Sequence, residues 1–313
     1  MRTVLLFVPA LMTAACFSDS APGQPDAIDP AGVHHTYIVD SITLPETNAD
    51  ANTYALDLDG DGNTENKIGQ ILALVMSLGD FGQAVNTTIA ERITAGELIH
   101  LFDVQATSLA NAERVGWYPF LGADPDGDAS DNWPGPETYT APVPGEPGAG
   151  DITDSVLTAA GGRLPLALIL PNTDETIVLQ LRAASINADI SAGTLSGVIG
   201  GAVVGDDIDR VLLPALQLGL QAAVDDSCGT DPCPSNSLGG QILDLFDDNN
   251  DGTVSVDELR GDSLVNSLLT PDLDLLDADG DYNPGVDGVN DSLSFAVRFT
   301  AVPADFPVPG AAQ

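Results

Sequence analysis

Residues 247–258 read Asp-Asp-Asn-Asn-Asp-Gly-Thr-Val-Ser-Val-Asp-Glu, and they set the organisation of the C-terminal part of the chain. Oxygen-bearing side chains recur along this stretch, and Gly252 stands at its centre, where a sharp turn needs a residue without a Cβ. Calcium is a hard cation that takes six to eight oxygen ligands in a flexible shell. The stretch therefore predicts a calcium-binding loop. Its expected ligands are Asp247, Asn249, Asp251, Thr253 (through its carbonyl), Ser255 (through a water) and Glu258.

Both flanks of this loop have helical spacing. Apolar residues recur at Leu238, Ile242, Leu243 and Phe246 before it, and at Leu259, Leu264, Val265 and Leu268 after it. Over residues 235–270 the chain resembles the EF-hand family, and the resemblance implies a helix–loop–helix unit that binds Ca²⁺. Gly261 is a departure from the family pattern, because it weakens the helix that follows the loop. The alternative is a solvated acidic turn between two helices.

Two further acidic stretches contain parts of the same pattern. Asp57, Asp59, Asp61, Asn63 and Glu65 repeat its early positions, but Ile68 occupies the last ligand position; the stretch resembles the half-loops of dockerin and thrombospondin type 3 repeats. Asp277, Asp279 and Asp281 begin a similar loop, which Tyr282 interrupts. Both are candidate calcium ligands, and the alternative for both is an Asp-rich turn. Neither is an evident partner for the loop at 247–258, so a solitary structural site and a paired sensor both stay open.

The N-terminus has the pattern of an export signal. Residues 1–15 combine Arg2 with an apolar run too short to span a bilayer, which predicts a signal peptide. Small residues before Cys16 resemble a bacterial lipobox, which implies lipidation of Cys16; ordinary cleavage is the alternative. Residues 16–32 are predicted to form a flexible tether. We therefore expect an exported protein of the bacterial cell envelope, anchored at the outer membrane, similar to EF-hand-containing lipoproteins of unassigned function.

Cys228 and Cys233 are the two other cysteines of the chain. Their spacing suits a small disulfide loop in an oxidising compartment. A zinc site would need two more ligands, and the spacing is not that of a redox-active Cys-x-x-Cys pair. The sequence therefore predicts a structural disulfide between them.

The charge of the chain excludes one class of partner. Its 47 acidic and 9 basic residues give a formal net charge of −38, a field that repels phosphate backbones and attracts divalent cations. We expect no nucleic-acid binding, and membrane contact only through the lipid anchor. Hydrophobic residues make up 43% of the chain, as in globular proteins, so the chain is expected to fold despite its charge. Bound Ca²⁺ is then expected to offset the repulsion among the acidic residues.

The periodicity of the remaining chain predicts an α+β fold. Alternating or continuous apolar residues predict strands joined by turns or long loops, with a bulge near Ala184 and a final strand at 293–302 that returns to the sheet. This favours an antiparallel β-sheet or sandwich with helices packed on one side. Residues 33–313 are expected to form one domain, which includes a Pro/Gly-rich loop at 119–150. The strands are predicted at 36–44, 97–108, 114–120, 164–170, 176–190, 194–204 and 293–302.

Three functions remain open from the sequence. The first is an exported calcium-binding lipoprotein in which structural calcium orders an interaction or envelope domain. The second is a calcium-dependent surface module that recognises a glycan or protein partner, for which Trp133 in the 119–150 loop is a candidate contact. The third is a hydrolase with paired carboxylates, for which Asp103, Glu175 and Asp189 are candidates. The chain lacks common catalytic signatures, so we favour a function other than catalysis.

Overall fold

The computed structural model describes residues 28–76, 81–127, 138–169, 176–229, 233–277 and 283–308. The predicted signal peptide and Cys16 lie outside the described residues, as does Trp133. The strands are β1 (Val33–Thr43), β2 (His100–Ala106), β3 (Ala112–Ala123), β4 (Thr140–Pro144), β5 (Gly148–Thr153), β6 (Val156–Ile169), β7 (Thr176–Ser191), β8 (Thr194–Val204) and β9 (Ser292–Pro303).

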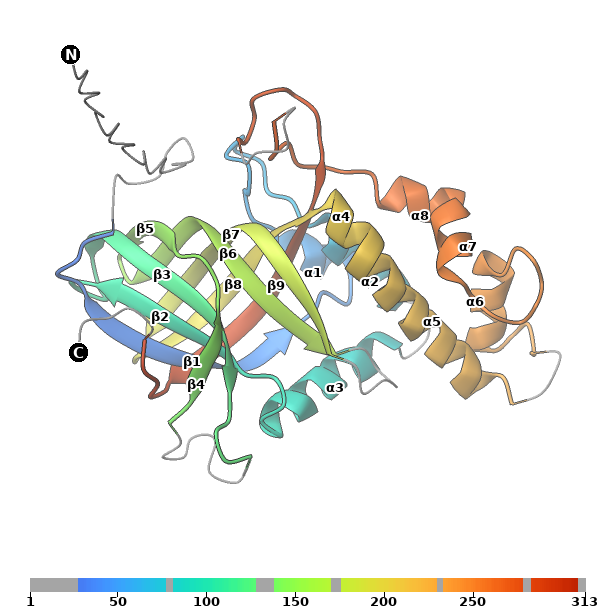
Figure 1. The fold of residues 1–313 in the computed structure, drawn as a ribbon, viewed down its shortest axis with the longest axis horizontal. Helices are drawn as coiled ribbons and strands as arrows, with labels where there is room; N and C mark the ends of the chain where they lie inside the picture. The colour runs from blue at the N-terminus through green and yellow to red at the C-terminus, as the bar shows by residue number, and fades with distance from the viewer. Residues whose placement is uncertain are drawn as a thin grey trace, which may run out of the picture.

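The strands form one antiparallel sheet that closes on itself (Figure 1). Its order is β2-β1-β9-β8-β7-β6-β5-β3-β4, and an additional pairing joins β2 to β3. Residues 100–105 of β2 pair with residues 116–121 of β3, while the other edge of β2 pairs with β1. The antiparallel sheet expected from the sequence is confirmed, but it is neither an open sheet nor a two-sheet sandwich. Closure requires the pairing of β2 with β3, which strand periodicity does not encode.

The interior of the closed sheet is the main core. Successive side chains of a strand point to opposite faces, so alternate residues of each strand line the interior. Phe102 of β2 packs edge to face on Trp117 of β3 at 5.5 Å and on Phe299 of β9 at 5.4 Å between ring centroids. All three side chains are fully buried. Aromatic pairs in this geometry stabilise a core beyond the area they bury.

The final strand and the bulge near Ala184 agree with the sequence. β9 lies between β1 and β8, so the end of the domain returns to its beginning. In β7 the register shifts against both neighbouring strands around Ala183, which has a positive φ of 48°. An extra residue at this point lets Leu179 and Leu181 before it, and Ile186 after it, all reach the interior.

The loop predicted at 119–150 is shorter than expected, and this part of the prediction is wrong. β3 continues to Ala123, and β4 and β5 occupy much of the remainder. Proline is tolerated in β4 because this strand pairs only with β3 and is an edge. Glycine is needed in β5 because a Cβ at Gly150 would collide with the backbone of Thr158 in β6. Proline and glycine here mark an edge strand and a close approach of two strands.

The tether predicted through residue 32 ends earlier than expected. The amide of Asp29 donates to the carbonyl of Arg114 at 2.8 Å, and the Gln105 side chain donates to the carbonyl of Asp29 at 3.2 Å. A Cβ at Gly116 would touch Ile28. The described part of the predicted tether therefore packs on β2 and β3, because Ile28 offers an apolar side chain to bury.

The helices gather toward one end of the closed sheet (Figure 1). Val85, Ile89 and Ile93 of α3 belong to the main core, so this helix covers interior residues of the sheet. α5 to α8 form a separate unit with its own apolar core around Val254 and Leu259. Among the described residues, no helix is both long enough and apolar enough to span a membrane. The helices are α1 (Asn48–Thr53), α2 (Lys67–Met76), α3 (Phe81–Thr94), α4 (Gly205–Asp207), the π-helix η1 (Ile208–Leu212), α5 (Leu213–Ser227), α6 (Leu238–Phe246), α7 (Val256–Gly261) and α8 (Ser263–Leu268).

Candidate metal centres

The loop at 247–258 lies between α6 and α7, and its side-chain oxygens turn back onto its own backbone. Asp247 accepts hydrogen bonds from the amides of Asp251 at 3.1 Å and Gly252 at 2.9 Å. Asn249 accepts from the amide of Asp251 at 2.8 Å, and Asp251 accepts from the amide of Thr253 at 2.9 Å. Gly252 has a φ of 85°, which a residue without a Cβ adopts at no cost.

Glu258 closes the loop from its far end. Its Oε1 accepts from the amide of Asn249 at 3.3 Å, and its Oε2 accepts from the amide and the hydroxyl of Ser255 at 2.9 and 2.8 Å. Ser255 also caps the N-terminus of α7, so the local sequence fixes both residues at once. The hydrogen bonds from Ser255 lower the pKa of Glu258, and those from Thr253 lower the pKa of Asp251. Both carboxylates are therefore held in the charged form that a cation requires.

The loop at 57–65 repeats this arrangement position by position. Asp57 accepts from the amide of Gly62 at 3.1 Å, as Asp247 does from Gly252. Asp59 accepts from the amide of Asp61 at 3.2 Å, and Asp61 accepts from the amide of Asn63 at 2.7 Å. These are the counterparts of the bonds made by Asn249 and Asp251.

The backbones of the two loops also turn at the same positions. Gly60 and Gly62 have φ angles of 80° and 89°, and the matching Asn250 and Gly252 have φ angles of 57° and 85°. Left-handed conformations at two matched positions are uncommon outside specific turns. Two segments far apart in the chain, with different neighbouring elements, therefore share one loop geometry.

The carboxylates of the 57–65 loop lie close together. Asp57, Asp59 and Asp61 each place one oxygen within 4.8 Å of the others, which is close enough for one metal ion to bind all three. Burial first, and then the charges of Asp59 and Asp61, raise the pKa of Glu65 to about 7. Burial also raises the pKa of Asp59. A bound cation would relieve this repulsion.

The residue at the last ligand position of the 57–65 loop, Ile68, is not a ligand in the structure, as the sequence indicated. Ile68 is buried in the main core, so it supplies no ligand there. Glu65 Oε2 is buried and has no hydrogen-bond donor among the described residues. An isolated bridge between Leu56 and Glu65 holds this end of the loop against its beginning. Glu65 therefore has a buried carboxylate oxygen at the end of this loop, but it lies outside the group of three aspartates whose oxygens come within 4.8 Å of one another.

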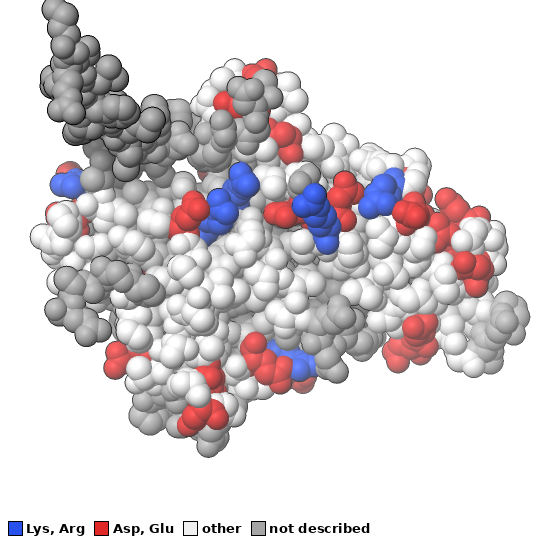
Figure 2. All heavy atoms as spheres, in the orientation of Figure 1, with Lys and Arg blue, Asp and Glu red and all other residues white. Residues whose placement is uncertain are grey.

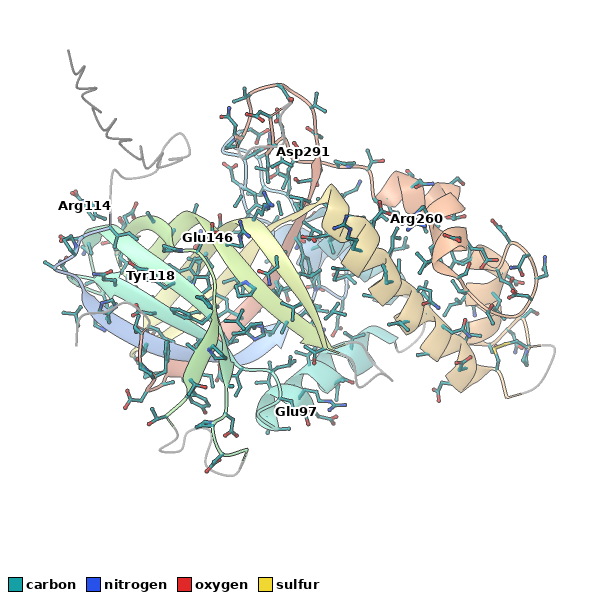
Figure 3. The ribbon with its side chains drawn as sticks, viewed as in Figure 1. Glu97, Arg114, Tyr118, Glu146, Arg260 and Asp291 are labelled. Carbon is teal, nitrogen blue, oxygen red and sulfur yellow. A yellow bond between two sulfur atoms is a disulfide. The ribbon has the colours of Figure 1, made fainter. Side chains whose placement is uncertain are left out.

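The third predicted stretch is only partly described. Asp277 lies within the described residues, and Asp279 and Asp281 lie outside them. In the loop around this stretch, the carboxylates of Asp272, Asp274, Asp287 and Asp291 accept hydrogen bonds, and the sequence pattern singled out neither Asp272 nor Asp274. Figure 3 labels Asp291 in this loop, beyond the end of the sheet. The only signal in the sequence was the alternation of Asp and Leu in residues 272–275. This alternation is typical of a strand, so it did not indicate metal ligands.

Helix α5 occupies the position that a second loop would take beside the 247–258 loop. The amide of Val254 donates to the side chain of Gln221 at 2.8 Å, and the carbonyl of Val254 accepts from the side chain of Gln217 at 2.9 Å. Paired calcium loops satisfy these two backbone groups by pairing with each other as short strands. Two glutamines one turn apart on α5 satisfy them here, so the described structure gives this loop a helix as its neighbour.

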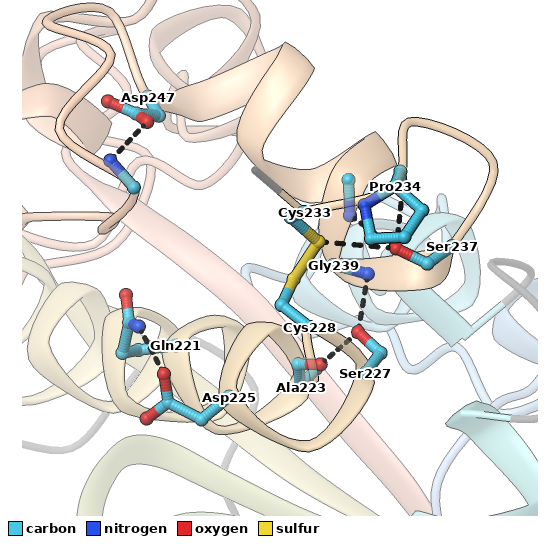
Figure 4. The surroundings of a disulfide bond; sticks show 12 residues. Gln221, Ala223, Asp225, Ser227, Cys228, Cys233, Pro234, Ser237, Gly239 and Asp247 are labelled. Carbon is cyan, nitrogen blue, oxygen red and sulfur yellow. Dashed lines mark hydrogen bonds between the residues drawn. A yellow bond between two sulfur atoms is a disulfide. The ribbon is translucent and has the colours of Figure 1, made fainter. Parts of the chain in front are cut away.

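The predicted disulfide is present between Cys228 and Cys233, with their Cα atoms 4.9 Å apart (Figure 4). It joins the end of α5 to the segment before α6. Ser227 reinforces this junction, because its hydroxyl donates to the carbonyl of Ala223 and accepts from the amide of Gly239. A Cβ at Gly239 would collide with the sulfur of Cys228, which explains the glycine early in α6. The junction fixes α6, and therefore one side of the acidic loop, relative to α5.

The candidate carboxylates for hydrolysis do not lie together. Asp103 of β2 is fully buried, and its Oδ2 lies 2.7 Å from Nδ1 of His34 in β1. Asp189 is exposed on β7, and three strands separate β7 from β2 in either direction around the closed sheet. Glycosidase pairs need carboxyl groups about 5–9.5 Å apart. Glu175 lies outside the described residues.

Acidic side chains are the more frequent charged groups on the face of the molecule shown in Figure 2. On the face shown in Figure 2 they gather at the loops and over the helical unit, and much of the sheet surface carries no charge. A separate apolar pocket of about 110 Å³ lies between α2 and the unit of α5 to α8. Leu74, Leu245 and Leu264 line it and remain exposed.

Comparison of the chain with protein-family models, with curated proteins and with solved structures finds no match to any of them. The geometry of the acidic loops is therefore the basis on which a function can be argued.

Proposed function

We propose that this protein binds Ca²⁺ through the loops at 247–258 and 57–65, and that the bound ions are structural. The observation that carries the proposal is the shared geometry of the two loops, which have equivalent hydrogen bonds and equivalent positive-φ positions. The 247–258 loop adds Glu258 at the position where EF-hand loops place a bidentate carboxylate. This supports an EF-hand helix–loop–helix formed by α6 and α7.

The donor atoms favour calcium over other metals. The candidate ligands are carboxylate, amide, hydroxyl and carbonyl oxygens, without nitrogen or sulfur, which disfavours zinc and copper. Magnesium requires near-ideal octahedral geometry and retains its waters, whereas calcium accepts the irregular shell that such a loop provides. A chain with a net charge of −38 also gains from cations that reduce its self-repulsion.

The anchoring of the loops supports a structural role for the ions. The 247–258 loop is bonded to α5 through Val254, and Arg260 of α7 forms ion pairs with Asp209 and Asp257. A loop fixed on a neighbouring helix has less freedom to open on binding than a pair of free EF-hands. Calcium modules outside cells bind their ions at about 10⁻⁴ to 10⁻³ M, and we expect affinities of that order.

The proposal places the protein outside the cytoplasm. The disulfide between Cys228 and Cys233 supports an oxidising compartment. Together with the signal-like residues 1–15 and the lipobox-like Cys16, it supports a lipid-anchored protein of a bacterial cell envelope. Labelling with a radioactive fatty acid, compared between the native chain and Cys16→Ser, tests the anchor; equal labelling of the two would exclude lipidation at Cys16.

The variant Glu258→Gln tests the calcium site at 247–258. Glutamine keeps one oxygen for the amide and hydroxyl of Ser255, loses the acceptor for the amide of Asn249, and cannot bind Ca²⁺ with two charged oxygens. Calorimetric titration of the purified protein should show at least about a tenfold loss of affinity at one site, the order seen when ligand shells are weakened. The rise in melting temperature on adding calcium should fall in parallel.

The matched control is Glu91→Gln, which removes an equal charge from an exposed position on α3. It should bind calcium as the native protein does. Unchanged calcium binding in Glu258→Gln would exclude the 247–258 loop as a site.

A further inference from the structure

We propose that the buried carboxylate of Asp274, next to the bridge between Leu273 and Ser292, binds a divalent cation of its own. This site is separate from the two loops above, and it rests on the proposed function only for the identity of the ion.

Backbone hydrogen bonds close the loop around Asp274 at its base. The amide of Leu273 donates to the carbonyl of Ser292 at 3.1 Å, and the amide of Asp291 donates to the carbonyl of Leu273 at 2.8 Å. Further in, the amide of Gly285 donates to the carbonyl of Asp274 at 3.0 Å. Asp274 therefore lies inside the loop, between its base and the turn at 285–288.

The carboxylate of Asp274 is buried and only half satisfied. The residue is 7% exposed. Its Oδ2 accepts from the amide of Gly288 at 2.7 Å, while its Oδ1 is buried without a hydrogen-bond donor among the described residues. A carboxylate in this state is costly to bury unless a positive charge or further donors reach its free oxygen.

The loop itself supplies negative charge and no compensating cation. The described residues of this loop, 272–277 and 283–291, include five aspartates and no lysine, arginine or histidine. Asp291 is satisfied differently, because its Oδ2 accepts from the amide of Leu276 at 2.8 Å and its Oδ1 accepts from the hydroxyl of Ser292. Asp287, next to Gly288, accepts from the amide of Val289 at 2.9 Å. The free oxygen of Asp274 thus lies in an acidic loop that has no basic side chain among its described residues, where a hard cation would supply the missing positive charge.

The loop packs against the 57–65 loop. Leu56 and Leu58 before and within that loop share one apolar cluster with Leu273 and Leu275. The charge of Asp272 also acts on Glu65. Figure 1 shows the two loops together beyond the same end of the sheet. Because the two loops share one apolar cluster, an ion that orders one loop would also help to order the other, so we expect their binding to be positively coupled.

The test counts the Ca²⁺ ions bound per molecule by equilibrium dialysis, in the native protein, in Asp274→Asn and in the control Asp189→Asn. Asparagine has nearly the shape of aspartate and can still accept from Gly288. We expect three ions in the native protein and the control, and two in Asp274→Asn. Because the substitution removes an uncompensated buried charge, Asp274→Asn should melt no lower than the native protein in chelator, yet gain less from added calcium.

The outcomes separate this site from the two proposed above. An Asp274→Asn variant that is folded in chelator and binds as many ions as the native protein would overturn the inference. So would a lower melting point in chelator with an unchanged ion count, since Asp274 would then serve the fold alone. If the native protein binds a single ion and Asp274→Asn removes it, the inference stands and the proposed sites at 247–258 and 57–65 fail.

Discussion

At the scale of single residues, the interior of the closed sheet contains one ionisable group of interest. His100 of β2 is fully buried, and its Nε2 accepts a hydrogen bond from the amide of Ala167 in β6 at 3.0 Å. Nδ1 therefore carries the proton of the neutral ring. Burial lowers the pKa of His100 from 6.5 to about 4. The folded protein thus requires a neutral imidazole at this position.

This requirement makes the stability of the fold depend on pH. Between pH 6.5 and about 4 the unfolded chain binds a proton at His100 that the folded chain does not bind, so stability is full above pH 6.5 and falls as the pH drops through this window. The loss from this group should reach about 3 kcal/mol. Urea denaturation of the native protein and of His100→Gln at several pH values measures it, because glutamine does not titrate and can still accept from Ala167.

The carboxylates of the chain titrate in both proteins, so their contribution cancels in the difference between the two free energies of unfolding. We expect the native protein to lose its advantage over His100→Gln as the pH falls from 7 to 4. A difference in stability that stays constant over this range would show that His100 titrates alike in the folded and unfolded chains.

At the scale of elements, α5 supports the acidic loop from outside. Gln217 and Gln221 satisfy both backbone groups of Val254, so the loop depends on a helix that precedes it in the chain. Gln221→Ala should leave the amide of Val254 without its partner, at a cost of about 1–3 kcal/mol. Calorimetry should then show about a tenfold weaker calcium site, since about 1.4 kcal/mol corresponds to a factor of ten.

The exposed Gln241 of α6 provides the control, and Gln241→Ala should bind calcium normally. Equal affinities in Gln221→Ala and Gln241→Ala would mean that α5 does not hold the loop in its binding conformation.

The disulfide acts on the same unit. Replacing Cys228 and Cys233 by serine removes a crosslink over a short loop, which chain-entropy arguments value at about 2 kcal/mol. Urea denaturation should detect this loss, and the native protein under reducing conditions should match the double variant. If reduction does not change the stability of the native protein, the crosslink contributes nothing to the helical unit.

Some elements of the fold could be predicted from the sequence and others could not. Alternation located β7 and β9 and even the bulge at Ala183, because one face of each strand is buried and the pattern records it. β4 and β5 were missed, because their prolines and glycines serve an edge and a close strand approach that only the partner strands reveal. The acidic loops at 247–258 and 57–65 could be picked out from the sequence because their carboxylates and turn residues lie close together along the chain. Asp274 was missed because its burial depends on Gly288, fourteen residues away.

At the scale of the whole molecule, the main apolar core and the acidic side chains lie in different parts of the structure. The closed sheet buries its apolar residues inside and shows an uncharged surface over much of the view in Figure 2. The acids concentrate in loops beyond the end of the sheet and in the helical unit. Calcium would therefore act mainly on these outer parts. In chelator the loops and helical unit should loosen before the sheet does.

The place of β9 between β1 and β8 also has a consequence for how the chain is made. β1 pairs with β2 early, but its other edge finds β9 only when that strand leaves the ribosome, after most of the described strands have been synthesised. At typical translation rates the delay is roughly ten to fifty seconds. Until then β1 and β8 each keep an open edge that chaperones must shield from aggregation. A sheet that cannot close before β9 emerges leaves the chain unfolded long enough to be threaded through a translocation pore, which is compatible with the export proposed above.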